Sequence, residues 1–156
     1  FETGDVEIEI EDVSLGEILQ ALDAEFRGNA QAKSLDFEVA TSTEVVRTDR
    51  ELLTKALRSL VANAIRYTEE GKVAVRCARE NGGLRITVSD TGIGIADDHL
   101  ADIFDEFYRV EYDPAARDVG LGLGLTIVDR ITRLLGITLS VESEPGAGSS
   151  FALLLP

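Results

Sequence analysis

The stretch that decides the fold is KVAVRCARENGGLRITVSD, which runs from Lys72 to Asp90. Apolar and polar residues alternate on both sides of the central Asn-Gly-Gly, which is the composition of a tight turn. Two alternating segments joined by such a turn predict an antiparallel β-hairpin. Because side chains alternate along a strand, one face of the second strand carries Leu84, Ile86, Val88 and Asp90.

Asp90 ends this apolar row with a carboxylate. Burying an ionised acid costs several kcal/mol unless hydrogen-bond donors meet it, so the position requires a partner. Gly92 and Gly94 follow closely, and glycine lets a backbone pass near a flat ligand. An acid beside such glycines suits an exocyclic amino group, such as that of adenine. A turn-initiating aspartate is the structural alternative. A dinucleotide-binding fold is disfavoured because the third glycine and an immediately following helix are missing.

Strands and helices alternate on both sides of the hairpin. Capping boxes at Ser14 with Glu17 and at Thr48 with Glu51 predict two helix starts. The predicted architecture is a two-layer α/β (α+β) sandwich, with helices on one face of a mixed, mostly antiparallel sheet. The expected elements are a strand at Val6–Val13, a helix from Ser14 to about Lys33, strands at Leu35–Ala40 and around Val45, a helix from Thr48 that ends by Thr68–Gly71, the hairpin, a helix from about Leu123 to Leu135 closed by Gly136, and strands at Ile137–Ser143 and Ser149–Pro156.

Asn63 lies at the edge of the apolar stripe of the second predicted helix, with Arg66 and Tyr67 three and four positions later. One helical edge thus offers an amide oxygen, a guanidinium group and an aromatic ring. These groups suit a metal ligand, a phosphate contact and a base-stacking surface. The alternative is an ordinary amphipathic helix boundary with a core tyrosine.

The third candidate site is Val119-Gly-Leu-Gly-Leu-Gly-Leu125, in which three alternating glycines enter a helix. Free N–H groups and the helix dipole make such a start an anion site. A close-packed helix start is the alternative.

The chain carries 29 acidic residues against 15 Lys and Arg, a formal charge of −14. This balance argues against a nucleic-acid-binding surface, which needs clustered basic residues. Residues 1–26 hold nine acids and no Lys or Arg, whereas residues 27–82 carry a net charge of +2. The segment with Asn63, Arg66 and Tyr67 is therefore slightly basic, and a phosphate ligand remains compatible with the composition.

No apolar run approaches the ~20 residues of a membrane helix, and the first residues resemble neither a signal nor a transit peptide. The single cysteine, Cys77, rules out an intramolecular disulfide framework. We therefore expect a soluble domain. Since the sequence starts without Met in what reads as a connecting segment, we expect a piece of a longer protein.

Five motifs, taken in order, resemble those of the catalytic ATP-binding domain of sensor histidine kinases, in the GHKL ATPase superfamily. They are LRSLVANAIRYT (the N box), DTGIGI, IFDEFYRV (the phenylalanine box), GLGLGLTIV and GAGSSF, and together they cover essentially the whole chain. The resemblance implies a Bergerat-type ATP-binding fold that uses ATP and Mg²⁺.

The resemblance also implies a role for each matching residue. Asn63 is the Mg²⁺ ligand, Asp90 recognises the adenine amino group, and Asn63, Arg66 and Arg109 form the catalytic set. Phe104 and Phe107 match the phenylalanines at the front of a mobile ATP lid at about residues 105–121. The full set implied to bind ATP is Asn63, Arg66, Tyr67, Asp90, Gly92, Gly94, Ile95, Phe107, Gly120, Leu121, Gly122, Gly124, Leu125 and Ser150.

One departure bears on the reaction. Ser59 occupies a position where gyrase-like and chaperone members of the superfamily carry a glutamate that activates water. Without that base, phosphoryl transfer is favoured over hydrolysis. The only histidine, His99, lies in a polar helical turn and is interpreted as a surface residue. The resemblance therefore implies transfer of the ATP γ-phosphoryl group to a histidine on a separate domain.

The implied organisation is the end of a linker at residues 1–5, following a dimerisation/histidine-phosphotransfer hairpin, and a catalytic domain at residues 6–156. The implied partners are that hairpin domain of the same protein and, downstream, a response regulator receiver domain. Contact with nucleic acid or membrane is not expected of this domain, which the resemblance places in the cytoplasm. A membrane anchor elsewhere in the whole protein is compatible with this.

Two alternatives stay open. One is a nucleotide-binding pseudokinase that signals by lid movement without transfer, although intact Asn63, Asp90 and lid glycines argue against it. The other is an anti-sigma-factor type serine kinase of the same superfamily, and the phenylalanine box argues against that.

Overall fold

A five-stranded sheet forms the base of the structure, a computed structural model that describes residues 7–80, 82–92, 120–144 and 148–156. The strand order is β2-β4-β5-β7-β6. β2 is parallel to β4, and every other neighbouring pair is antiparallel. This confirms the predicted mixed, mostly antiparallel sheet. The strands are β2 (Asp36–Val39), β4 (Lys72–Glu80), β5 (Gly83–Asp90), β6 (Thr138–Glu144) and β7 (Gly148–Leu155).

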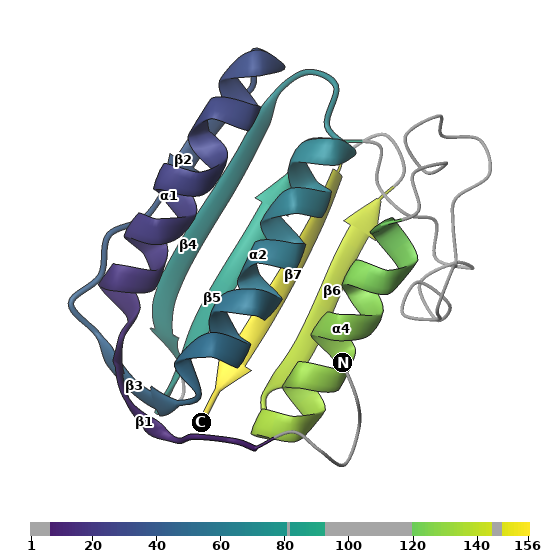
Figure 1. Cartoon of the computed structure of the whole chain (residues 1–156). Helices are drawn as coiled ribbons and strands as arrows, with labels where there is room; N and C mark the ends of the chain where they lie inside the picture. The colour runs from purple at the N-terminus through teal and green to yellow at the C-terminus, as the bar shows by residue number, and fades with distance from the viewer. Residues whose placement is uncertain (1–6, 81, 93–119, 145–147) are drawn as a thin grey trace.

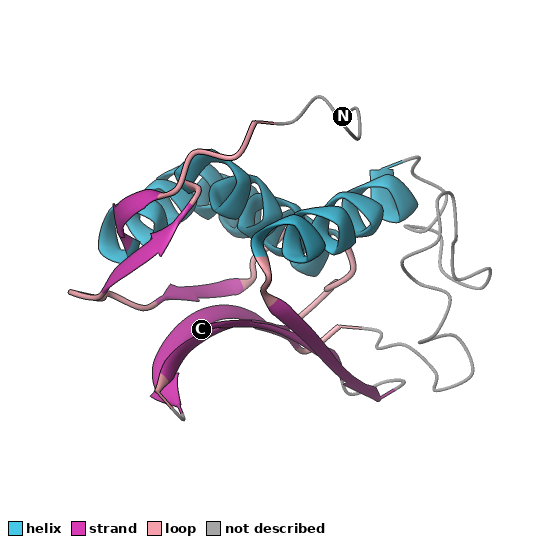
Figure 2. Cartoon of the chain, turned by 90° about the horizontal axis from the view of Figure 1, so that it is seen from below, coloured by secondary structure: helices cyan, strands magenta, loops and turns pink. Residues whose placement is uncertain are grey.

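Three helices cover one face of this sheet, with α2 in the middle (Figures 1 and 2). The structure is therefore the expected two-layer sandwich. Within the described part of the chain, no helix is both long enough and apolar enough to cross a membrane. The helices are α1 (Leu15–Ala32), α2 (Arg50–Arg66) and α4 (Gly120–Leu135).

The N-terminal strand is shorter than expected. β1 spans only Glu11–Ser14 and pairs antiparallel with β3 (Val45–Thr48) in a separate two-stranded ribbon. Residues 7–10 are not in a strand, although apolar and acidic residues alternate through them. Alternation alone does not create a strand where no neighbouring strand accepts its hydrogen bonds.

The two predicted capping boxes need correction. Ser14 is the N-cap residue of α1, but its side chain makes no capping hydrogen bond. The N-cap of α2 is Asp49, one residue after the predicted Thr48. The Asp49 carboxylate accepts from the N–H of Leu52 at 3.0 Å and from the N–H of Glu9 at 2.8 Å. A charged acceptor with two donors, placed at the positive end of a helix dipole, outcompetes a threonine hydroxyl.

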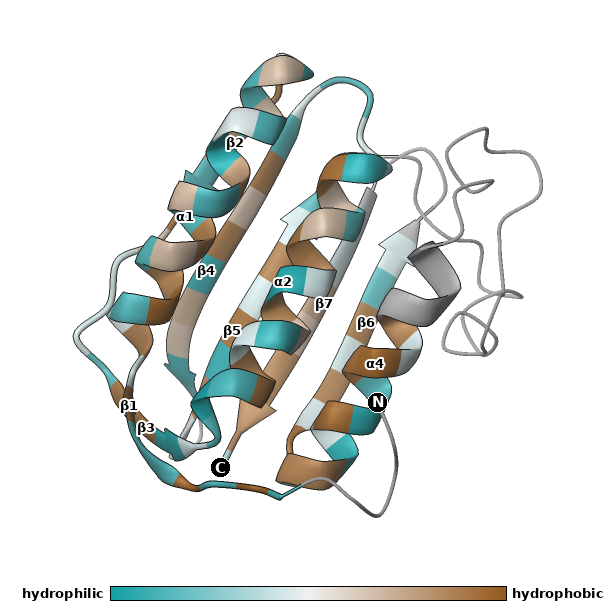
Figure 3. Ribbon diagram, viewed as in Figure 1, coloured by the Kyte–Doolittle hydropathy of each residue, from teal (hydrophilic) through white to brown (hydrophobic). Residues whose placement is uncertain are grey.

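The core lies between the helices and the inner face of the sheet. The alternation of apolar and polar residues along β5 and β6 appears as bands of brown and paler colour in Figure 3. Each fully buried Leu or Val contributes ~1.5–3 kcal/mol through removal from water. The buried stripe of α2 is the predicted one, namely Leu52, Leu53, Ala56, Leu57, Leu60, Val61, Ala64 and Ile65.

Two glycines give a matched test of the backbone geometry. Gly148 has φ of 112°, and a Cβ there would overlap the carbonyl oxygen of Asp90. Gly28 lies inside α1, where a Cβ would meet nothing within 4 Å. We expect Gly148→Ala to lower the free energy of unfolding by more than ~1 kcal/mol, and Gly28→Ala to raise it by ~0.5–1 kcal/mol, both measured by urea denaturation. Equal effects of the two substitutions would contradict the described backbone at Gly148.

Candidate functional site

Among the described residues, the predicted site residues of α2 and of the segment after β5 lie close together, because α2 and β5 end at the same place. In Figure 1 the C-terminal end of α2, the end of β5 and the beginnings of β7 and α4 all lie at one end of the molecule. A Cβ at Gly92 would overlap the carbonyl oxygen of Tyr67 and lie 2.9 Å from the Thr68 hydroxyl oxygen. The chain leaving β5 therefore runs directly against the end of α2. This contact brings the Asn63–Tyr67 segment close to the Asp90–Gly92 segment.

Asp90 is half-buried at the end of β5. One carboxylate oxygen accepts a hydrogen bond from the N–H of Gly92 at 2.9 Å, and the backbone of Ser149 supplies a second bond. The bond to Gly92 is the side-chain-to-backbone turn that the structural alternative anticipated. Burial nevertheless raises the pKa of Asp90, and these two hydrogen bonds only partly oppose that rise.

Asn63 lies in the last turn of α2, where its backbone carbonyl accepts from the N–H of Tyr67 at 3.0 Å. Its side-chain Nδ2 is buried and has no hydrogen-bond partner among the described residues. Leaving a buried polar atom unpaired costs ~1–3 kcal/mol, and such atoms call for an explanation. A half turn of the amide exchanges Nδ2 and Oδ1, so this position can offer either a donor or an acceptor. Asn63 thus fits a ligand atom, including the oxygen-preferring Mg²⁺.

Arg66 and Tyr67 close the helix. Arg66 is the last helical residue and Tyr67 is the C-cap. Tyr67 packs its ring partly against the hydrophobic core, as the alternative for this residue expected. Both side chains are half-buried, at the end of α2 that faces Gly92.

The pairing register of β5 and β7 shows that Ser149 and Ser150 lie on opposite faces of the sheet. Ser149 lies opposite Asp90, and Ser150 lies opposite Ser89. Directly opposed residues share a face, so Ser149 lies on the face of Asp90 and Ser150 on the other. The predicted residue Ser150 is therefore not on the face that carries Asp90. The sequence could have placed Ser149 on this face, because it lies two positions before Phe151 in the same strand. Phe151 is a core residue that is 8% exposed.

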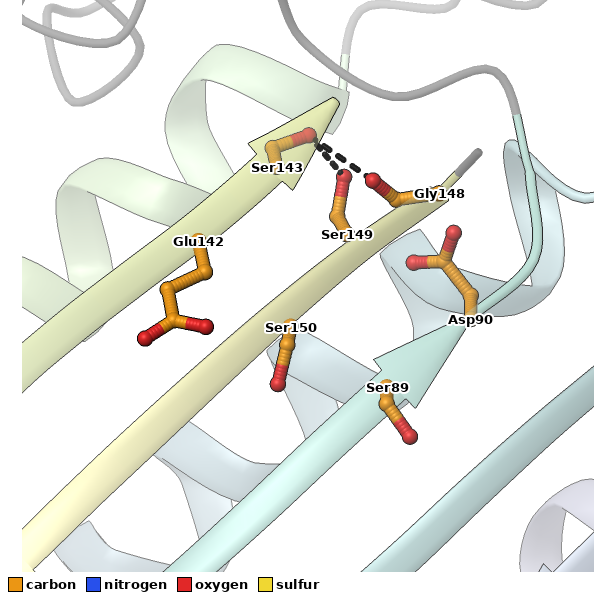
Figure 4. A pocket seen from close by; sticks show the side chains of 7 residues that line it. All are labelled: Ser89, Asp90, Glu142, Ser143, Gly148, Ser149 and Ser150. Carbon is orange, nitrogen blue, oxygen red and sulfur yellow. Dashed lines mark hydrogen bonds between the residues drawn. The ribbon is translucent and has the colours of Figure 1, made fainter. Parts of the chain in front are cut away.

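An open hollow of about 390 Å³ lies at this end of the sheet (Figure 4). Residues from both faces of the strand ends line it, namely Ser89, Asp90, Glu142, Ser143, Gly148, Ser149 and Ser150. The hydroxyl groups of Ser143 and Ser149 lie 2.7 Å apart, and Ser143 also donates to the carbonyl oxygen of Gly148 at 3.1 Å. Since the Ser143 proton is used in the bond to Gly148, Ser149 donates to Ser143. The Ser149 oxygen keeps acceptor capacity toward the hollow.

The glycine-rich segment forms the beginning of a helix. Gly120, Leu121, Gly122 and Gly124 lie in the first turns of α4, so its first N–H groups lack partners within the helix. Leu125 is only 2% exposed and belongs to the core. The remaining predicted residues, Gly94, Ile95, Phe104, Phe107 and Arg109, lie outside the described residues, as do His99 and the lid up to residue 119.

The raised pKa of Asp90 can be measured directly. We expect its carboxyl carbon to titrate, by NMR, above the ordinary value of 3.8. A peptide of residues 87–93 is the control for the unfolded chain. The folded protein then binds this proton more tightly than the unfolded chain. The stability of wild type relative to Asp90→Asn should therefore fall as the pH rises from about 3.8 through the folded pKa. A midpoint at or below that of the peptide would contradict the burial of this group.

Comparison with known proteins places the chain in a family. The model of the family described as "Histidine kinase-, DNA gyrase B-, and HSP90-like ATPase" matches residues 48–156. Sensor histidine kinase AtsR of Burkholderia thailandensis is 37% identical over 137 residues, which cover 83% of this chain and 23% of AtsR. Autoinducer 2 sensor kinase/phosphatase LuxQ of Vibrio cholerae is 35% identical over 163 residues, which cover 100% of this chain and 19% of LuxQ. The chain thus spans about a fifth of the length of these two relatives.

Solved structures share the fold. Full-length ShkA in complex with AMPPNP superposes with a TM-score of 0.81 at 28% identity, over 97% of this chain and 32% of ShkA. The catalytic domain of histidine kinase ThkA superposes with a TM-score of 0.80 at 25% identity, over 95% of each chain. These matches confirm the resemblance carried by the five motifs. The chain therefore belongs to the family of histidine kinase-, DNA gyrase B- and HSP90-like ATPases, and within it is the ATP-binding catalytic domain of a sensor histidine kinase.

Proposed function

We propose that this domain binds ATP as its Mg²⁺ complex at the junction of α2 and β5 and delivers the γ-phosphoryl group to a histidine on a separate domain. The observation that carries the proposal is the half-buried Asp90 carboxylate, which accepts hydrogen bonds from backbone N–H groups and lines an open hollow. An aligned carboxylate of this kind accepts a hydrogen bond from an exocyclic amino group. Asp90 then selects adenine, with the Ser149 hydroxyl beside it.

The proposed position of the phosphate groups is between the end of α2 and the beginning of α4. Asn63 is the proposed Mg²⁺ ligand, which its buried Nδ2 supports, because this atom has no hydrogen-bond partner among the described residues. Arg66 is the proposed basic residue near the phosphates, and Tyr67 the proposed aromatic residue near the base. The free N–H groups at the glycine-rich start of α4 suit phosphate oxygens. Mg²⁺, when bound, neutralises phosphate charge.

Transfer rather than hydrolysis follows from Ser59. This residue lies one helical turn before Asn63 in α2 and is half-buried. A serine hydroxyl does not remove a proton from water as a carboxylate does, so no general base is positioned there. The domain's contribution is then to hold the nucleotide and exclude water, while the bond from the γ-phosphorus to the β,γ-bridging oxygen breaks and a bond to the acceptor nitrogen forms.

The proposal about the rest of the protein is based on the relatives, which are several times longer than this chain. We propose a dimerisation/histidine-phosphotransfer domain in the same protein as acceptor, and a response regulator receiver domain downstream. The proposed boundaries are a linker end at residues 1–5, the catalytic domain at 6–156 and, within that domain, a lid at about 105–121. Phe107 and Arg109 are proposed nucleotide contacts within the lid, and Gly94 and Ile95 are proposed contacts before it. The domain is proposed to work in the cytoplasm.

Labelled transfer tests the function. The chain is incubated with γ-labelled ATP, Mg²⁺ and the dimerisation/histidine-phosphotransfer domain of its own protein. The expected product is an acid-labile, alkali-stable label on that domain, which identifies phosphohistidine. Acid-stable label would indicate a serine kinase, and tight nucleotide binding without any label would indicate a nucleotide sensor. Either outcome would overturn the proposal.

The adenine assignment has its own test. We expect Asp90→Asn to weaken Mg²⁺-ADP binding by at least ~1 kcal/mol, about fivefold or more, because the new amide presents a donor where an acceptor is needed. Calorimetry on the folded variant measures the change. Asp12→Asn, the same change in the β1–β3 ribbon, is the matched control and should bind like wild type. Unchanged affinity in Asp90→Asn, or an equal loss in both variants, would rule out Asp90 as the adenine acceptor.

A further inference from the structure

We propose that Lys33 is a positioning residue for nucleotide binding, because its ammonium group fixes the end of α2 and thereby the orientation of Asn63. The inference rests on the proposed function, since it concerns the same nucleotide site. Lys33 is not among the residues that the sequence motifs single out.

The ammonium group of Lys33 joins two helices that are distant in sequence. Lys33 is the C-cap residue of α1. Its Nζ donates to the carbonyl oxygen of Ile65 at 2.8 Å and to that of Arg66 at 3.1 Å. The last carbonyl groups of a helix have no partner four residues ahead within the helix, so they need donors from elsewhere. A cation at this end also complements the helix dipole.

The neighbouring carbonyl groups are held as well. Thr68 is fully buried, and its hydroxyl donates to the carbonyl oxygen of Ala64 at 2.7 Å. The Tyr67 carbonyl lies against the backbone of Gly92, as described above. Three successive carbonyl groups, from Ala64 to Arg66, thus accept side-chain hydrogen bonds at the end of α2. Lys33 provides the contacts of the last two, and it is the contact that comes from α1.

The two helices do not pack closely where Lys33 crosses between them. A hollow of about 590 Å³ separates them, lined by Phe26, Ala32 and Lys33 from the α1 side and by Ala62, Ile65 and Arg66 from α2. Without the ammonium group, the Arg66 carbonyl would lose this donor, and the Ile65 carbonyl would keep the longer bond from the Thr68 N–H at 3.4 Å. The end of α2 then gains freedom to fray.

Fraying at the C-terminal end of α2 would change the position of Asn63 in the proposed site. Asn63 lies one turn before the contacted carbonyls, and its own carbonyl accepts from the N–H of Tyr67. Its Nδ2 has no partner among the described residues, so that atom does not anchor the amide. The orientation of Asn63 toward a bound ligand therefore depends on the helix end that Lys33 holds.

A double-mutant cycle tests this dependence. Lys33→Met keeps the aliphatic stem and removes the donor, and Lys55→Met makes the same change nearer the start of α2. We expect Lys33→Met to raise the dissociation constant of Mg²⁺-ADP at least fivefold by calorimetry, with Lys55→Met within twofold of wild type. In an Asn63→Ala background the effect of Lys33→Met should shrink below twofold, because Lys33 acts through Asn63. Lys33→Arg, which retains donors, should recover most of the affinity.

Hydrogen exchange provides a readout without nucleotide. We expect Lys33→Met to speed exchange of the Tyr67 and Thr68 amides, which bond to Asn63 and Ile65, while amides in the middle of β5 are unchanged. If Lys33→Met fails to fold, Lys33→Gln replaces it, with a smaller change of the same sign. Unchanged affinity and exchange in the folded variant, or equal affinity losses in both backgrounds, would overturn the role of Lys33. Failure of wild type to bind Mg²⁺-ADP would instead overturn the proposed function as well.

Discussion

The nucleotide end of this fold depends on the contact between the backbone at Gly92 and the carbonyl group of Tyr67. A Cβ at Gly92 would overlap that carbonyl, so only glycine allows β5 and α2 to end side by side. In the sequence, the motif suggests that Gly92 lets the backbone pass near a flat ligand. The structure shows a second reason for glycine at this position, namely the close approach of the end of α2. This contact brings the end of α2, which carries Asn63, against the end of β5, which carries Asp90, although the two elements belong to different layers. Lys33, on the far side of the helix end, holds the same segment from α1.

The charge distribution fits this arrangement. The chain has a formal charge of −14, and nine of its acids fall in the first 26 residues. Acidic side chains of that segment, Glu7, Glu9 and Glu11, lie beside the N-terminal end of α2, which is the opposite end of that helix from Asn63. Within the site, the carboxylate of Asp90 is bonded to the backbone of Gly92 and Ser149. Such a site provides N–H groups and few cations, so a polyphosphate is best accommodated together with its own metal ion.

The sequence predicts the local parts of this structure well and the long-range parts less well. The hairpin of β4 and β5 follows from period-two alternation around a glycine turn, and the stripe of α2 from helical spacing, since both signals are contained in one segment. The cap at Asp49 was missed because its second donor, the N–H of Glu9, lies 40 positions away. The pairing of Ser149 with Asp90 could not be predicted, because the motif that contains Ser150 does not fix the strand register. Lys33 gives no sequence signal, since its partners are more than 30 positions away on another helix.

The most direct test of the central claim is a map of backbone amide chemical shifts for this chain with and without Mg²⁺-ADP. If the nucleotide binds at the junction of α2 and β5, the largest changes should fall at residues 63–68, at 90–92, at 148–149 and in the first turn of α4. The β1–β3 ribbon should change little. Changes centred on that ribbon, or no change at millimolar nucleotide, would contradict the account.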